Sequence, residues 1–218
     1  MSTEAASTIA GLLFWLIIVT NIASNQFGYQ TFGDPESEAD LHEIDADPRR
    51  FKIGFTLITF EHLCIILLAV VLFIAFDDLN LVLALVWLVS RGTEGLMQIF
   101  EKRSYWRLLE IARQHASAVG DERRGLADRR EGILRSKRAN FLFAQILFAV
   151  GTFSYSLVFA TNSVVPALLA WFGVAAAVLY GFGNAMTIRN PDSRNVWNIS
   201  GLAILVFEAI LGGWLLFG

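Results

Sequence analysis

Hydrophobic residues occur in this chain in long blocks that few polar residues interrupt. A helix that crosses roughly 30 Å of bilayer hydrocarbon, at about 1.5 Å per residue, needs about 20 such residues. Six blocks reach this length, and the pattern therefore predicts an all-α, polytopic transmembrane helix bundle that forms a single domain over residues 1–218. The predicted spans are approximately 8–27, 53–76, 79–100, 139–161, 164–188 and 196–217.

Very short connections join four of these blocks in pairs. Only Asp77 and Asp78 separate the second span from the third, and a turn at 161–163 separates the fourth from the fifth. Connections of this length predict antiparallel helical hairpins. Pro166 suits the first turn of the fifth span, because a backbone N–H at that position has no partner within the helix.

Composition agrees with the membrane class. The mean hydropathy is +0.54 and 17% of the residues are charged, whereas soluble domains contain about 25%. The net charge of −3 provides no general attraction to nucleic acid, so we expect no nucleic-acid partner. The single cysteine, Cys64, cannot form an internal disulfide. We therefore expect a multi-pass protein of the cell membrane, with the lipid bilayer as its surroundings.

The positions of lysine and arginine predict the orientation. Sixteen of the 17 basic residues lie in the first, third and fifth loops, and basic loops tend to stay in the cytoplasm. Both termini are therefore predicted to be extracytoplasmic. An acidic block in the first loop argues for the opposite orientation, but acidic residues have little weight in this rule, and the block can lie against the basic third loop. The block consists of Asp34, Glu36, Glu38, Asp40, Glu43, Asp45 and Asp47.

The third loop, residues 101–138, contains eleven basic and six acidic residues and has an amphipathic pattern. The simplest interpretation is a charged cytoplasmic helical hairpin between the third and fourth spans. One alternative is an interfacial helix that lies on anionic lipid headgroups. Another is a docking surface for a cytoplasmic protein, which would make the chain a scaffold or sensor subunit. The apolar stripe of this loop consists of Tyr105, Leu108, Leu109 and Ala112.

Ionisable residues inside the predicted spans are the most informative signal about function. A charge at the centre of a lipid-facing helix costs roughly 2.5–3.5 kcal/mol, so we expect these side chains to face the interior of the bundle. Arg91 and Glu94 are three residues apart, which places them on one face of the third span. The candidates for a ligand or proton site are Glu61, His62, Arg91, Glu94, Gln98, Gln145 and Glu208.

The charge balance of this cluster leaves three interpretations open. Three carboxylates and one guanidinium leave an excess of negative charge in a medium of low dielectric constant. The residues can form a structural polar network, a cavity that binds a small ligand or relays protons, or a metal site of Glu61, His62 and Glu208. Metal or acid–base chemistry at these residues would make the protein a membrane enzyme. No phosphate-binding loop, CxxC, HExxH or serine-nucleophile motif is present, so catalytic residues and cofactors stay unassigned.

A family resemblance rests on several short segments. They are Thr-Ile-Ala-Gly-Leu-Leu at 8–13, Arg-Phe-Lys-Ile-Gly at 50–54, Arg-Gly-Thr-Glu at 91–94, Phe-Glu-Ala at 207–209 and Gly-Trp-Leu-Leu-Phe-Gly at 213–218. With these segments the chain resembles a prokaryotic six-helix membrane family that is catalogued only as a domain of unknown function. The resemblance implies a six-helix fold over nearly the whole chain and points at Arg91, Glu94 and Glu208, but it implies no activity. The third loop departs from the family in its length and arginine content.

Overall fold

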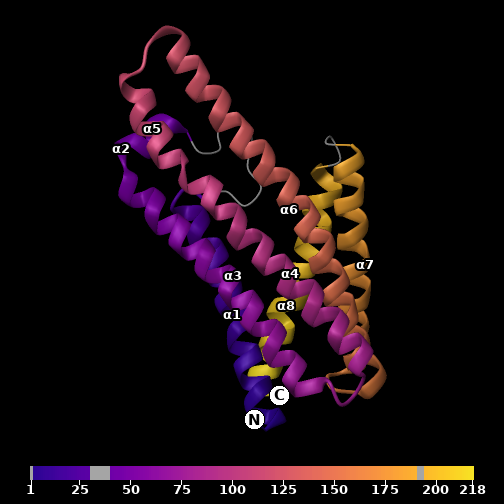
Figure 1. Cartoon of the computed structure of the whole chain (residues 1–218). Coiled ribbons are helices and arrows are strands. Elements are labelled where there is room, and N and C mark those ends of the chain that lie inside the picture. Colours follow the sequence, from indigo (N-terminus) through magenta and orange to yellow (C-terminus); the bar gives the residue numbers. More distant parts are fainter. Residues whose placement is uncertain (1, 30–39, 191–193) are drawn as a thin grey trace. The chain divides into compact units, whose positions relative to one another are not determined.

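The computed structural model describes residues 2–29, 40–190 and 194–218, and within these ranges all regular structure is helical (Figure 1). This confirms the predicted all-α class. The helices are α1 (Thr3–Gln26), α2 (Leu41–Ala46), α3 (Pro48–Phe76), α4 (Leu81–Trp106), α5 (Leu108–Ser117), α6 (Gly120–Asn162), α7 (Ala167–Arg189) and α8 (Arg194–Phe217).

Five of these helices, α1, α3, α6, α7 and α8, are long and apolar enough to cross a membrane, which is typical of a multi-pass membrane protein. Each contains one of the predicted spans, apart from a few residues at the ends of the span. The third predicted span lies in α4, which is not among the five, because polar residues interrupt its second half. Those residues are Arg91, Glu94, Gln98, Glu101 and Lys102.

Helix α6 differs most from the predicted boundaries. The apolar pattern begins at residue 139, whereas the helix begins at Gly120 and continues for 43 residues. Residues 120–138 contain many good helix formers, such as arginine, and no proline, so nothing in them ends the helix. The third loop is therefore helical over most of its length. At the start of α7, Pro166 is the N-cap rather than a residue of the first turn, because the helix begins one residue later.

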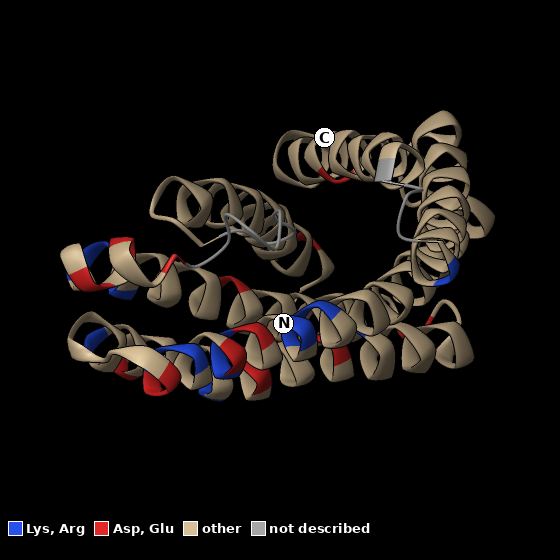
Figure 2. Ribbon diagram, turned by 90° about the horizontal axis from the view of Figure 1, so that it is seen from above, with Lys and Arg blue, Asp and Glu red and all other residues tan. Residues whose placement is uncertain are grey.

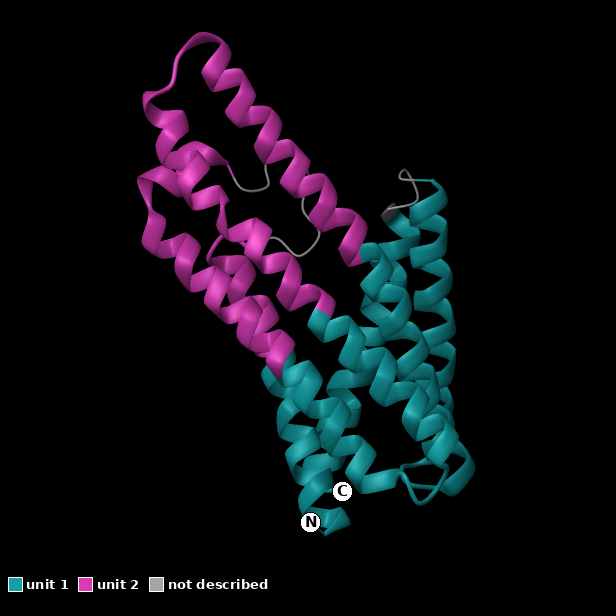
Figure 3. Ribbon diagram, viewed as in Figure 1, with its two compact units in different colours: residues 1–18, 64–96, 142–218 teal, residues 19–63, 97–141 magenta. Residues whose placement is uncertain are grey.

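The described residues form two compact units (Figure 3). Unit 1 consists of Met1–Ile18, Cys64–Leu96 and Leu142–Gly218, and unit 2 consists of Val19–Leu63 and Met97–Phe141. Helices α1, α3, α4 and α6 each contribute residues to both units, while α7 and α8 belong to unit 1 alone.

Unit 1 has an aromatic core and a largely apolar surface. Trp87, Tyr155 and Phe207 are buried in it, and the Trp87 Nε1–H donates a hydrogen bond to the carbonyl oxygen of Ala69 over 3.3 Å. At the surface, residues such as Leu168 and Phe217 are almost fully exposed. A helix bundle that exposes large apolar side chains suits lipid rather than water as its solvent.

Close backbone contact joins α1 to α8 in unit 1. A Cβ atom at Gly11 would lie 2.8 Å from the carbonyl oxygen of Gly212, and one at Gly212 would lie 3.0 Å from Cβ of Phe14. Small residues at such positions allow two helices in lipid to approach closely and gain packing energy.

Unit 2 has an apolar core of its own, and the first and third loops meet in it. Helix α2 packs against α5, and Arg123 Nη2 lies 3.3 Å from His42 Nε2. This agrees with the expected contact between the acidic block and the basic third loop for residues 40–47. Asp34, Glu36 and Glu38 lie outside the described residues. Basic and acidic residues occur together on some helices, while other helices are almost free of charged residues (Figure 2).

The amphipathic stripe of the third loop is buried inside unit 2. Its four residues belong to the core of the unit, where they pack with Tyr29 and Phe51, and none of them is more than 7% exposed. The stripe is therefore covered by the protein itself and is not free to face lipid as the apolar side of an interfacial helix. The four residues of the stripe are Tyr105, Leu108, Leu109 and Ala112.

Candidate functional site

Helix α4 brings Arg91 and Glu94 into direct contact in unit 1. Arg91 Nη1 donates a hydrogen bond to Glu94 Oε2 over 2.7 Å, and the two side chains are only 4% and 3% exposed. The pair is three residues apart on one helix face, as the sequence predicts. Because both groups are charged, this bond is stronger than one between neutral groups.

Residues of α6 shape the surroundings of the Arg91 guanidinium. The guanidinium carbon lies 4.3 Å from the centre of the Phe148 ring, within the range of a cation–π contact. Gly151 lies against the aliphatic part of the arginine, where a Cβ atom would be 2.6 Å from Arg91 Cγ. Any larger residue at 151 would therefore displace the arginine.

Glu208 of α8 is the second carboxylate beside Arg91. It is buried in unit 1 and lies close enough to Arg91 and to Tyr155 to interact with both electrostatically. Its Oε1 atom is fully buried and makes no hydrogen bond with any described residue. A buried carboxylate oxygen without a hydrogen-bond donor is energetically costly. The Arg91 guanidinium is the positive charge beside both Glu94 and Glu208.

Hydroxyl groups of α6 accompany these charges. The oxygen atoms of Thr152, Tyr155 and Ser156 are buried, and they form no hydrogen bond within the described part of the chain. The Tyr155 ring stacks on Phe207, with 6.2 Å between the ring centres. Thr152 and Ser156 are four residues apart and therefore share one face of α6. The sequence does not single out Tyr155, because a tyrosine in an apolar run also fits an ordinary core position.

Gln145 belongs to a hydrogen-bonded chain that links α6, α7 and α8. The Tyr180 hydroxyl donates to Gln145 Oε1 over 2.7 Å, and Trp197 Nε1–H donates to Asn184 Oδ1 over 3.0 Å. Asn184 Nδ2 in turn donates to the carbonyl oxygen of Tyr180. The Phe148 ring, which covers Arg91, also contacts Tyr180 edge to face. Gln145 is thus bound by protein groups next to the site.

The other predicted site residues, Glu61, His62 and Gln98, are buried in unit 2. Asn21 Nδ2 donates to both carboxylate oxygens of Glu61, over 3.2 and 3.1 Å. His62 Nδ1 contacts the carbonyl oxygen of Ile58, one turn earlier in α3. The structure therefore brings together Arg91, Glu94 and Glu208 within unit 1, and it pairs Glu61 with an asparagine within unit 2.

The metal prediction gains no support from this geometry. Among the described residues, no three His, Cys, Asp or Glu side chains come together as a possible ligand group. Of the predicted ligands, Glu61 and His62 belong to unit 2 and Glu208 belongs to unit 1.

Unit 2 also holds two buried lysines, although the sequence predicts that both lie in the charged third loop. Lys102 Nζ donates to Glu101 Oε2 over 2.9 Å, and Lys137 Nζ lies 4.5 Å from the centre of the Tyr29 ring and 5.0 Å from that of Tyr105. Burial, with a contribution from Glu101, raises the pKa of Tyr29 well above its ordinary value. The phenol therefore stays neutral and offers its ring face to the cation.

The family model described as Domain of unknown function (DUF4386) matches residues 9–218. Because the match covers almost the whole chain, the chain belongs to this family. The resemblance to a family of unknown function is confirmed, and the match specifies neither an organism nor a number of spans. No curated protein and no solved structure matches the chain.

Proposed function

We propose that this member of the DUF4386 family relays protons across the membrane through the Arg91 cluster, which we define as Arg91, Glu94, Glu208 and Tyr155. The observation that carries the proposal is that two buried carboxylates accompany one guanidinium, while Glu208 Oε1 has no hydrogen-bond donor among the described residues. An uncompensated negative charge is unfavourable in a nonpolar interior, and binding a proton removes it.

Close packing around the cluster favours a proton over a larger ligand. A Cβ atom at Gly173 would lie 2.4 Å from the Phe207 ring and 2.6 Å from Ser156 Oγ, and Gly151 is equally crowded by Arg91. Interiors packed at this density have little room for a bound molecule, whereas a proton requires only a suitable oxygen atom. The alternative, a small polar ligand at the same residues, is separated from proton transfer by the experiment below.

The direct ion pair suggests how the two acids exchange protons. While Glu208 holds a proton, Arg91 stays paired with Glu94. When Glu208 releases its proton, its carboxylate competes for the guanidinium, and Glu94 becomes the acid that is neutralised by a proton. Arg91 thus compensates one carboxylate at a time, and Tyr155 interacts electrostatically with Glu208 beside it.

We also infer that α4 is a sixth membrane-crossing helix. Arg91 and Glu94 compensate each other within α4 and are buried in unit 1, so neither presents a free charge to lipid. With six spans both termini lie on the same side of the membrane, and the basic loops lie on the cytoplasmic side. The helical region at 101–138 is then cytoplasmic.

Proton flux into liposomes that contain the purified protein and an internal pH-sensitive dye tests the proposed function. We expect the protein to dissipate an imposed pH gradient, and Glu208→Gln to slow this flux about tenfold or more, because the amide cannot carry the proton. Glu4→Gln makes the same change at an exposed position and should retain the wild-type rate. An unchanged flux in Glu208→Gln would show that the proposal is wrong.

A spectroscopic measurement separates proton binding from a structural role. A protonated carboxylic acid has an infrared carbonyl band that a carboxylate lacks, and we expect pH-difference spectra to lose one such band in Glu208→Gln. Glu208→Asp keeps the acid and should keep the band, which preserves the test if the amide variant does not fold. Stabilisation of the protein by an added polar compound, without proton flux, would assign the cluster to a small ligand instead.

A further inference from the structure

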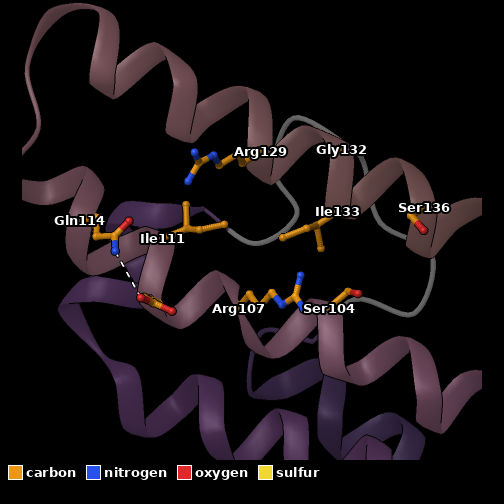
Figure 4. Close-up of a pocket in the computed structure, with 9 residues that line it drawn as sticks. Ser104, Arg107, Ile111, Gln114, Arg129, Gly132, Ile133 and Ser136 are labelled. Carbon is orange, nitrogen blue, oxygen red and sulfur yellow. Dashed lines mark hydrogen bonds between the residues drawn. The ribbon is translucent and has the colours of Figure 1, made fainter.

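A groove of about 560 Å³ lies between α5 and α6, and all of its lining residues belong to unit 2 (Figure 4). We call it the α5–α6 groove. Arg107 at the start of α5 and Gln114 near its end lie on one wall, and Arg129 and Ser136 of α6 lie on the other. Its size is within the range of roughly 300–1,000 Å³ that is typical of small-molecule sites.

Two guanidinium groups approach this groove from opposite walls (Figure 4). Among the described residues, neither Arg107 nor Arg129 forms an ion pair. In contrast, Arg135 on the same helix α6 is paired with Glu131 over 2.7 Å. An arginine without a carboxylate partner offers a planar set of N–H donors that matches the oxygens of a phosphate group.

Neutral polar groups add to the two arginines. The hydroxyls of Ser104 and Ser136 and the amide of Gln114 also line the groove. Glu110 contributes an acid to the lining, but its Oε1 accepts a hydrogen bond from Gln114 Nε2 over 3.3 Å, along the surface of α5. The two arginines outweigh this single acid, so the described lining keeps a positive charge.

One end of the groove lies close to the proposed membrane boundary. The proposed spans end at residue 100 and begin at residue 139, so Ser104 and Ser136 are each within about one helical turn of the hydrocarbon. The exposed Trp106 is typical of the interface between lipid and water. This step depends on the spans proposed above. It allows a headgroup to enter the groove while its acyl chains stay in the bilayer.

We propose that the α5–α6 groove binds the phosphate group of an anionic phospholipid. Arg107 and Arg129 contact the phosphate oxygens, and Ser104 and Ser136 donate hydrogen bonds to the headgroup. The groove exceeds the size of a phosphate ion and accommodates the attached glycerol as well. A soluble phosphate monoester has the same recognition chemistry, and the two sources differ in whether binding requires the acyl chains.

Native mass spectrometry of the detergent-purified full chain, titrated with phosphatidylglycerol, tests this site. We expect retained lipid adducts, and we expect the double variant Arg107→Gln/Arg129→Gln to bind at least about tenfold more weakly, because two charge-assisted contacts are lost. Arg124→Gln/Arg135→Gln removes the same charge from exposed positions of α6 and should bind like the wild type. Equal weakening in both double variants would overturn the proposal, because it would show a general charge effect.

The source of the phosphate is decided by parallel titrations with phosphatidylcholine and with glycerol 3-phosphate. Weaker binding of both than of phosphatidylglycerol supports the anionic lipid. Equal affinity for glycerol 3-phosphate would overturn the lipid assignment. Glu208→Gln should bind phosphatidylglycerol normally, because the groove and the Arg91 cluster share no residue, so failure of one proposal is distinguishable from failure of the other.

Discussion

Gly151 sets how closely α6 can approach the buried arginine of unit 1. We predict that Gly151→Ala destabilises the protein by about 1–3 kcal/mol, because a Cβ atom 2.6 Å from Arg91 Cγ forces the side chain away from Phe148. Thermal unfolding in detergent measures the loss, and the proton flux should fall with it. Gly213→Ala is the matched control, since a Cβ atom there meets nothing within 4 Å and the change should be neutral or slightly stabilising. Equal melting temperatures for the two variants would contradict the prediction.

Individual residues of the site differ in how far the sequence can predict them. The Arg91–Glu94 pair follows from a spacing of three residues within one helix, and the structure contains it. One partner of Glu61 is Asn21, 40 residues away in sequence, and the packing of α1 on α3 within unit 2 brings them together. Tyr155 gives no signal in an apolar run, because the same residue type is common in cores that carry no function.

Helices α2 and α5 are joined by two histidines that share one arginine. Arg123 Nε donates to His115 Nε2 over 3.3 Å, Arg123 Nη2 lies at the same distance from His42 Nε2, and the two imidazole rings are 5.5 Å apart. An imidazole nitrogen accepts a hydrogen bond only when it carries no proton. Protonation of His115 would therefore set two positive groups against each other at this junction.

We predict that acid loosens the contact between α2 and α5. Partial burial lowers the pKa of His115, and Arg123 and His42 lower it further, while Asp40 acts in the opposite direction. The pKa of His115 is therefore lower in the folded protein than in the unfolded chain. The neutral imidazole contributes its full stabilisation of the fold above the ordinary histidine pKa of about 6.5, and this contribution is lost as the pH falls below that value. Hydrogen-exchange protection of Leu41–Ala46, corrected for the intrinsic pH dependence of exchange, should fall between pH 7.5 and pH 5.5 in the wild type.

The matched variant for this measurement is His115→Gln, which keeps a polar side chain and cannot gain a proton in this range. Its protection at Leu41–Ala46 should change much less with pH than that of the wild type. The same pH response in both proteins would assign the effect to other groups of unit 2.

Whole helices are predicted well where they are apolar and poorly where they are charged. Each of the six apolar blocks lies in a helix, apart from a few residues at its ends, because roughly 20 apolar residues in a row have few other stable conformations in lipid. For residues 120–138 the sequence predicts part of a helical hairpin but not one continuous helix with the fourth span, because hydropathy does not mark where a charged helix begins or ends. Helix α2 has only six residues, and its N-cap hydrogen bond from the His42 N–H to Asp40 is too local a feature to reveal it in an acidic loop.

For the molecule as a whole, the membrane topology can be tested by cysteine labelling. The native Cys64 is buried, so Cys64→Ala provides a background for single cysteines at Ser2, Arg124 and Gly218. In intact cells we expect a membrane-impermeant maleimide to label the cysteines at 2 and 218, and the one at 124 only after permeabilisation, because basic loops stay in the cytoplasm. Labelling of only one terminus would indicate five spans and would exclude α4 as the sixth.

The division into two compact units is a property of the whole molecule that no sequence pattern predicts. The predicted single domain rests on the continuous series of spans, and the family match also extends over both units. Four helices supply residues to both units, so no linker, change of composition or run of glycine and proline marks a boundary. Such a division depends on which side chains pack together across distant segments, and hydropathy along the chain does not contain that information.

The backbone contact between Gly11 and Gly212 places α1 against α8, a helix that is synthesised about 200 residues later. At about 5–20 residues per second, synthesis of the intervening chain takes roughly 10–40 s. During this interval the glycine side of α1 lacks its final neighbour, and an insertase, a chaperone or lipid must occupy its place. A chain released before α8 is made therefore leaves the glycine side of α1 without the neighbour that it has in the complete bundle.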